Sequence, residues 1–278
     1  MINYTANFFK LDLLKISEIK LHETTECSRL RNIFDRISKS NYLMNPVIVG
    51  KHKNDFLLID GANRLSTLKE IGCKLAIAQV INYTDNKIKL KKWNHLVYEL
   101  DIEKIIEFCK SKKLEFENIN HSHAENIQKN GFHYIIVSVI KKNATILIHL
   151  PKNFNAMLKE LNLFTKYYFG NYNFDRSEEE IKISELKKHT RKKGILIEFP
   201  DFNKNQIIEI ANNKHKIPAG ITRHILNNRV LHLRYELWRL MDDKNIEQKK
   251  KDLEKYLNNK IDNNKVRQYR ESVIVFDE

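Results

Sequence analysis

One short segment has residue types and a spacing suited to binding a phosphate group. It consists of Asp60, Gly61, Ala62, Asn63 and Arg64. Residues 56–59 before it form an apolar run typical of a strand, and residues 65–71 after it have apolar side chains at helical spacing. A strand, a glycine turn and a helix N-terminus in this order direct backbone N–H groups and the positive end of the helix dipole at one spot. Arg64 adds a planar fork of donors, and Asp60 could orient a metal ion or a hydroxyl. The alternative is an ordinary Asp-Gly turn.

The size and composition of the chain predict a folded protein without a membrane segment. Its 278 residues are enough for one large domain or two smaller ones. No run of about 18 apolar residues occurs, and residues 1–7 lack the pattern of a secretory signal. Cys27, Cys73 and Cys109 are spaced too widely for a metal motif. We therefore expect a cytoplasmic protein with free thiols.

The net charge of +14 raises the question of a nucleic-acid partner. The basic residues are mostly lysines spread along the chain, with clusters at 87–92, 187–193 and 249–251. No stripe of arginines with interleaved aromatic residues is present, so solvated basic faces are favoured over a nucleic-acid interface. The positive field would also attract an anionic small molecule.

The hydrophobic periodicity predicts a compact α/β unit in about the first hundred residues. Its expected elements are a strand within 13–19, a helix at 28–37, strands at 46–49 and 56–59, a helix at 65–71 and a strand at 75–80. We place the boundary of this first domain at residue 98, so that a second domain occupies 99–278.

The second domain is predicted to be mixed α/β, which makes the whole chain α/β (α+β). Strands at 133–140 and 144–150 flank Lys-Lys-Asn, a hairpin signal. The other expected elements are helices at 103–111, 154–161, 204–212, 235–241 and 246–257, and strands at 194–199, 229–234 and 272–276. The two domains are expected to pack together, and the cleft between them is the default place for a ligand.

The first ninety-odd residues resemble the ParB/sulfiredoxin superfamily. The matching segments are 16–23, 45–49, 59–64 and 71–72. The resemblance implies the fold of the first domain, but the superfamily includes DNA-partition proteins, sulfinic-acid reductases and free-serine kinases. No cysteine lies at 60–64, where sulfiredoxin has its reactive thiol. The following segment predicts β-hairpins rather than the helix-turn-helix of a partition protein.

Segments near the C-terminus discriminate among these functions. Three segments resemble the free L-serine kinases, including the kinase of siderophore gene clusters. They are Ile-Pro-Ala-Gly-Ile-Thr-Arg-His at 217–224, the ending at 269–276 and, earlier in the chain, Trp-Asn-His at 93–95. The middle, 101–193, has no counterpart in this resemblance. The resemblance implies Mg²⁺-assisted transfer of a phosphoryl group from ATP, or from ADP, to the hydroxyl of free L-serine. The alternative is a ParB-like DNA-binding transcriptional or partition regulator switched by a nucleotide or another ligand.

The same resemblance implies roles for individual residues. Glu23 would be the general base, with Asp60 as a second catalytic residue. The nucleotide phosphates would contact Gly61, Ala62, Asn63, Arg64 and Arg29. The serine would contact Trp93, His95, Thr222, Arg223 and His224. His22 is interpreted as structural, and neither the metal ligands nor the oligomeric state is assigned.

Each of these roles has a structural alternative. Glu23 could cap the helix that begins near residue 28, and Arg29 could be a solvated helix residue. Trp93 could be a core residue, and residues 222–224 could form a surface turn. The family often has a histidine where this chain has Asn63, which cannot titrate near neutral pH. His121 and His123 are two candidate metal ligands, and two ligands do not make a site.

Overall fold

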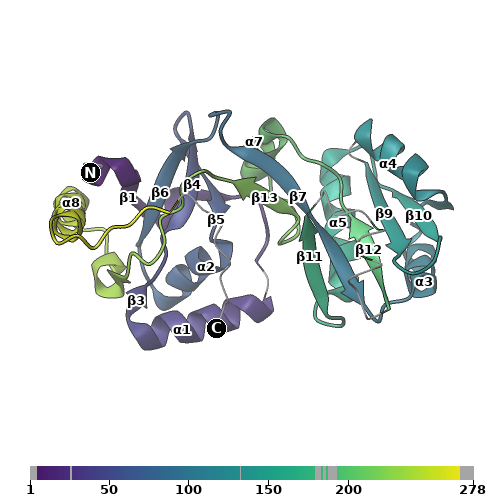
Figure 1. Cartoon of the computed structure of the whole chain (residues 1–278), viewed down its shortest axis with the longest axis horizontal. Coiled ribbons are helices and arrows are strands. Elements are labelled where there is room, and N and C mark those ends of the chain that lie inside the picture. Colours follow the sequence, from purple (N-terminus) through teal and green to yellow (C-terminus); the bar gives the residue numbers. More distant parts are fainter. Residues whose placement is uncertain are drawn as a thin grey trace.

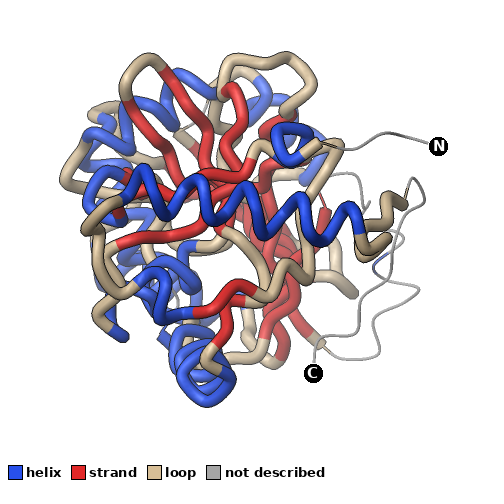
Figure 2. Tube along the Cα trace, turned by 90° about the vertical axis from the view of Figure 1, so that its left-hand side faces the viewer, coloured by secondary structure: helices blue, strands red, loops and turns tan. Residues whose placement is uncertain are grey.

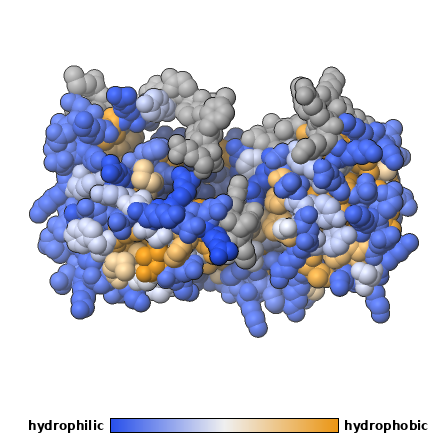
Figure 3. Space-filling model, turned by 90° about the horizontal axis from the view of Figure 1, so that it is seen from below, coloured by the Kyte–Doolittle hydropathy of each residue, from blue (hydrophilic) through white to orange (hydrophobic). Residues whose placement is uncertain are grey.

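The computed structural model describes residues 5–25, 27–131, 133–178, 183, 186 and 193–269, without the side chains of residues 27–29 and 178. Among the described residues the strands form two main sheets, which lie side by side along the long axis of the molecule (Figure 1). We call the parts built on the five-stranded and the seven-stranded sheet the first and the second lobe. Hydrophilic side chains cover most of the face seen from below, with apolar residues between them on both lobes (Figure 3).

The first lobe is built on a five-stranded sheet of order β1-β6-β4-β5-β2. The strands are β1 (Leu11–Lys15), β2 (Ile19–Leu21), β4 (Val47–His52), β5 (Asp55–Asp60) and β6 (Leu75–Asn82). Helices α1 (Cys27–Ser40) and α2 (Ala62–Ile71) contact each other below the sheet (Figure 1). Helix α8 (Ile246–Asp262) crosses the outer side next to β1 (Figure 2). Its Leu253 and Leu257 join the core of this lobe.

The second lobe is built on a seven-stranded sheet in which the paired strands are antiparallel. Its strands are β7 (Lys89–Tyr98), β8 (Phe116–Asn118), β9 (Tyr134–Val139), β10 (Thr145–His149), β11 (Phe174–Glu178), β12 (Gly194–Glu198) and β13 (Thr222–Ile225). The helices that accompany it are α3 (Ile102–Lys112), α4 (His121–Lys129), α5 (Phe154–Tyr168) and α7 (Lys204–Asn212). α3 and α5 share one apolar core with the sheet.

Strand β7 connects the two lobes. Its first residues pair with β13, and its later residues pair with β11 and β12 (Figure 1). Ile48, Leu57 and Ile59 of the first sheet belong to the same apolar cluster as the core of the second lobe. The domain boundary at residue 98 stays a prediction.

The predicted strand at 229–234 is wrong. Its backbone N–H groups do not donate to a neighbouring strand. Those of Val230 and His232 donate to the side chains of Gln79 and Asn45, and that of Arg234 donates to the carbonyl of Met44. His232 and Arg234 have positive φ angles of 53° and 57°, which a strand does not allow.

The predicted helix at 235–241 is also corrected. This stretch forms the short strand β14 (Tyr235–Glu236), paired with β3 (Tyr42–Leu43), and a 3₁₀ turn at Leu237–Leu240. The expected strand at 272–276 lies outside the described residues. No helix within the described ranges is long and apolar enough to span a membrane.

Candidate active site

The end of β2 is joined to a segment nearly two hundred residues further along the chain. Ile217 N donates to His22 O at 2.9 Å, and Thr24 N donates to Ile217 O at 2.8 Å. These bonds form a parallel bridge between Glu23 and Ile217. In the sequence, the two segments were related only because both match motifs of the free L-serine kinases. The structure places them in contact.

The carboxylate of Glu23 is held by the turn that follows residue 217. Oε1 accepts a hydrogen bond from Thr222 N at 2.9 Å and another from the Thr222 hydroxyl, and Oε2 accepts one from Gly220 N at 3.3 Å. The Glu23 side chain keeps 16% of its surface exposed, so it is oriented but still reachable. These partners lie in the 220–222 turn, so this network differs from the helix cap considered as an alternative.

Gly220 is needed in this turn for two reasons. Its φ of 74° is in the left-handed region, and a Cβ there would lie 2.4 Å from the guanidinium of Arg176. Its carbonyl accepts from His95 Nε2 at 3.0 Å. The turn that holds Glu23 is therefore positioned by Arg176, which packs against Gly220, and by His95, which donates to its carbonyl.

His95 is buried behind this turn and packs among the rings of Phe169, Phe174 and Phe199. Its Nδ1 lies 2.7 Å from the hydroxyl of Tyr168. Burial lowers the pKa of His95 to about 3, so the ring is neutral and donates from Nε2 to the carbonyl. Both ring nitrogens thus contact protein groups.

Two further histidines meet beside Glu23. His22 Nδ1 lies 2.8 Å from Leu58 O, and its Nε2 lies 2.9 Å from Thr222 Oγ1. His224 Nε2 lies 3.0 Å from the hydroxyl of Tyr83, and the rings of His22 and His224 are 5.5 Å apart. Burial lowers the pKa of both histidines.

Trp93 and Arg223 form a pair on the neighbouring strands β7 and β13. The guanidinium lies 4.3 Å from the centre of the indole ring, a cation–π contact. Trp93 is half-buried. The backbone N–H of Trp93 donates to Ile221 O at 2.7 Å, which ties this pair to the turn that holds Glu23.

The predicted phosphate-binding segment has the expected local geometry. Gly61, with a φ of 99°, precedes the first residue of α2, and among the described residues no side chain caps the helix. Asp60 Oδ2 lies 2.8 Å from Arg64 Nη2 and 3.2 Å from Arg229 Nη1. Arg229 also donates to His224 O at 3.1 Å. Two guanidinium groups therefore converge at an uncapped helix N-terminus, which favours an anion.

Glu23 and Asp60 lie at the same end of adjacent strands. β2 and β5 are parallel, with Leu21 opposite Leu58, so Glu23 and Asp60 each lie two residues beyond this pair. The side chain of Arg29 lies outside the described part of the chain.

Sequence reasoning missed Arg229, Arg176 and Tyr83. The alternating pattern at 229–234 predicted that Arg229 lies in a strand, and this pattern gave no sign of the contact between Arg229 and Asp60. Tyr83 is fully buried at the end of β6, and burial raises its pKa. No local signal pointed to Arg176, which is far from Gly220 in sequence.

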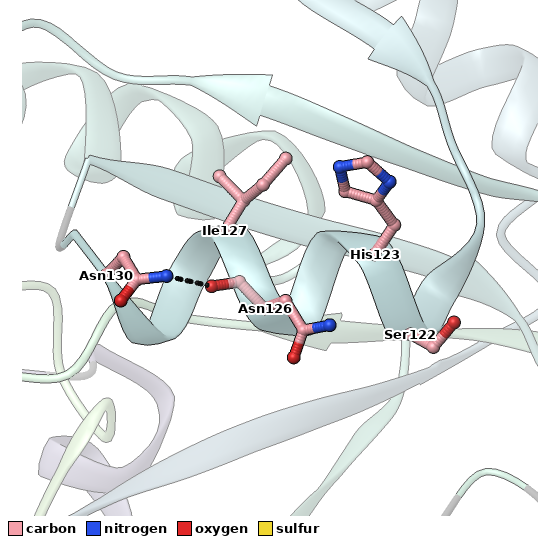
Figure 4. Close-up of a pocket in the computed structure, with 5 residues that line it drawn as sticks. All are labelled: Ser122, His123, Asn126, Ile127 and Asn130. Carbon is pink, nitrogen blue, oxygen red and sulfur yellow. Dashed lines mark hydrogen bonds between the residues drawn. The ribbon is translucent and has the colours of Figure 1, made fainter.

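The two candidate metal ligands His121 and His123 lie in different surroundings. His123 lines a surface pocket on α4 with Ser122, Asn126, Ile127 and Asn130 (Figure 4). His121 lies between two carboxylates instead, with Nε2 2.6 Å from Glu198 and Nδ1 3.8 Å from Glu125. Its hydrogen bond to Glu198 raises its pKa, which fits a protonated imidazole.

The fold of this chain is shared with solved serine kinases. No protein-family model matches it. The structure of C-terminally truncated SbnI from Staphylococcus aureus superposes with a TM-score of 0.70 at 20% identity, covering 90% of this chain and 97% of that one. A free serine kinase in complex with AMP gives a TM-score of 0.69 at 17% identity, with coverage of 83% and 93%.

Similar sequences carry related names. An ATP-dependent L-serine kinase of Staphylothermus marinus is 29% identical over 231 residues, which cover 77% of this chain and 84% of the relative. The ATP-dependent L-serine kinase SbnI of Staphylococcus aureus is 23% identical over 245 residues, which cover 86% and 87%.

Proposed function

We propose that this chain is a free L-serine kinase that transfers a phosphoryl group from ATP to the serine hydroxyl, giving O-phospho-L-serine. The observation that carries the proposal is the Glu23 carboxylate, oriented by Gly220 and Thr222 at the strand end next to the phosphate-type turn. The names of the related kinases support the same reaction. ADP is the alternative donor.

Glu23 acts as the general base that accepts the proton of the serine hydroxyl. Phosphoryl transfer depends mainly on positioning and on charge stabilisation, and a fixed carboxylate supplies the proton acceptor. In the first lobe, the strand, glycine turn and helix around Gly61 are of the ParB/sulfiredoxin type. The phosphates bind there, at Gly61, Ala62, Asn63 and Arg64, with Arg29 nearby.

The serine binds on the side of β13 and β7. Arg223, stacked on Trp93, presents a guanidinium suited to the serine carboxylate. Thr222 and His224 complete this side of the site. His95 supports the site from behind, because both its nitrogens bind protein groups.

Mg²⁺ fits the carboxylate at the phosphate turn. Both arginine contacts of Asp60 are made by Oδ2, so among the described residues Oδ1 is the oxygen left for a cation. Mg²⁺ is commonly held by one or two carboxylates together with substrate phosphates. When bound, it would neutralise charge on the phosphates.

The decisive assay is phosphorus NMR of purified protein with Mg²⁺, L-serine and either ATP or ADP. A phosphoserine resonance that depends on protein and on serine is expected, and the nucleotide that supports it is the donor. If folded protein gives no product with either nucleotide, the kinase proposal fails. The DNA-binding alternative would then be tested by the loss of DNA affinity with rising salt.

We expect Arg229→Gln to weaken nucleotide binding. Arg229 contacts Asp60 beside the helix N-terminus, so its loss removes one cation from the phosphate site. The expected result is an increase of roughly 10- to 100-fold in KM for the nucleotide, because a hydrogen bond to a charged group contributes about 1.5–3 kcal/mol.

Arg234→Gln is the matched control for this prediction. Arg234 lies in the same irregular segment but stacks on Tyr42, away from Asp60. Steady-state kinetics with both variants would count against the role of Arg229 if they gave the same nucleotide KM.

A further inference from the structure

Three side chains in the proposed site are connected through the Thr222 hydroxyl. Thr222 Oγ1 lies within hydrogen-bond distance of Glu23 Oε1 and 2.9 Å from His22 Nε2. The other ring nitrogen, His22 Nδ1, lies 2.8 Å from Leu58 O. A carbonyl oxygen only accepts hydrogen bonds, so Nδ1 must carry a proton.

This arrangement needs one proton more than the resting forms of the three groups supply. With Glu23 ionised and His22 neutral, the Thr222 hydroxyl has a single proton for two acceptors. One of its two contacts would then bring lone pairs together. Both contacts are hydrogen bonds only when a further proton resides on Glu23 or on His22 Nε2. The cluster of Glu23, Thr222 and His22 therefore has a hydrogen-bond position for one proton beyond those of its resting forms, and an incoming proton would be held there in common.

The surroundings allow His22 to carry this proton only beside the charge of Glu23. His22 is 4% exposed, and burial lowers its pKa, as does the charge of Lys216, whereas the charge of Glu23 raises it. The ring of His224 also faces His22, and burial lowers its pKa as well. A charged His22 is thus stable only as a net-neutral pair with the Glu23 carboxylate.

We propose that Glu23, Thr222 and His22 form a proton relay in which His22 is the final acceptor of the proton from the serine hydroxyl. The inference rests on the proposed kinase function and assigns proton-carrying roles behind Glu23 to His22 and to the Thr222 hydroxyl. Thr222 then acts through its hydroxyl as a proton carrier rather than as a contact for the substrate.

The step balances without any further reactant. The serine O–H bond breaks as its oxygen bonds to the phosphorus atom, and the bond from that phosphorus to the departing nucleotide breaks. The proton moves to Glu23 and then to Thr222 Oγ1, while the hydroxyl proton of Thr222 moves to His22 Nε2. Glu23 is again a carboxylate beside the new phosphate ester, and their repulsion favours release of phosphoserine. The proton then returns through the same groups to water.

The variants Thr222→Val and Thr222→Ser test the relay. Valine has nearly the shape of threonine and keeps the backbone N–H that holds Glu23, but it lacks the hydroxyl. We expect Thr222→Val to lower the single-turnover rate by roughly 10- to 100-fold with KM for serine within about twofold, and Thr222→Ser to keep most of the rate. If Thr222→Val instead raises the serine KM and keeps the rate, Thr222 binds substrate and the relay is wrong.

A measurement without turnover separates this inference from the kinase function. Nitrogen-15 NMR of the full chain follows His22 as the pH falls. We expect Nε2 of His22 to take up the proton in the wild type and its midpoint to move to lower pH in Glu23→Gln, because the charge of Glu23 raises the pKa of His22. An unmoved midpoint would overturn the shared proton. Absence of phosphoserine from the wild type would overturn only the kinase proposal.

Discussion

Glu23→Gln is expected to lower kcat by roughly 10²- to 10⁴-fold, the usual contribution of a general base. Glutamine keeps the shape of the side chain and can still accept from Thr222 N, but its amide cannot take the proton of the serine hydroxyl. Nucleotide affinity should stay within about twofold of the wild type, because the phosphate turn at Gly61 is unchanged. Rapid-quench kinetics and nucleotide titration measure the two quantities separately.

Glu18→Gln is the control for this prediction. Glu18 is an exposed carboxylate five residues before Glu23, so its loss changes net charge by the same amount without touching the site. Glu23→Gln at the wild-type rate would remove Glu23 as the base. Equal losses in both variants would mean that the effect is only one of charge.

The local part of the site could be predicted from the sequence. The run at 56–59 and the spacing at 65–71 gave β5 and α2 at nearly their observed bounds. Gly61 has the positive φ that the turn requires, so its identity carried structural information. Helices α3 and α7 and the hairpin of β9 and β10 were predicted for the same reason, because their patterns are local.

The parts that depend on distant contacts could not be predicted in this way. Strand β7 begins with Lys-Leu-Lys-Lys, which was interpreted as a basic cluster, and its partners β13 and β11 lie far along the chain. The bond between Arg229 and Asp60 joins residues 169 positions apart. Alternation at 229–234 predicted a strand, but within the described part of the chain no strand accepts its hydrogen bonds. Only the resemblance to serine kinases connected Glu23 with residues 217–224.

The buried His95 is expected to make the protein unstable in acid. Its pKa is about 3 in the folded chain against about 6.5 for a free histidine, so the unfolded chain takes up a proton that the folded chain refuses. The free energy of unfolding is therefore intact above about pH 6.5 and falls as the pH drops towards 3, by up to ~1.4 kcal/mol per pH unit. His22 and His224, whose pKa values burial also lowers, add to the loss with the same sign.

Urea denaturation between pH 7.5 and 4 measures this slope in the wild type, His95→Gln and His123→Gln. His95→Gln should flatten the slope by about one proton, since glutamine does not titrate. His123 is exposed on α4, so its variant should follow the wild type. Equal slopes in all three proteins would contradict the prediction. Protonation adds a proton at Nδ1 of His95, which faces the Tyr168 hydroxyl, and leaves the bond from Nε2 to the Gly220 carbonyl in place. Activity should therefore fall with stability only as the protein unfolds at lower pH.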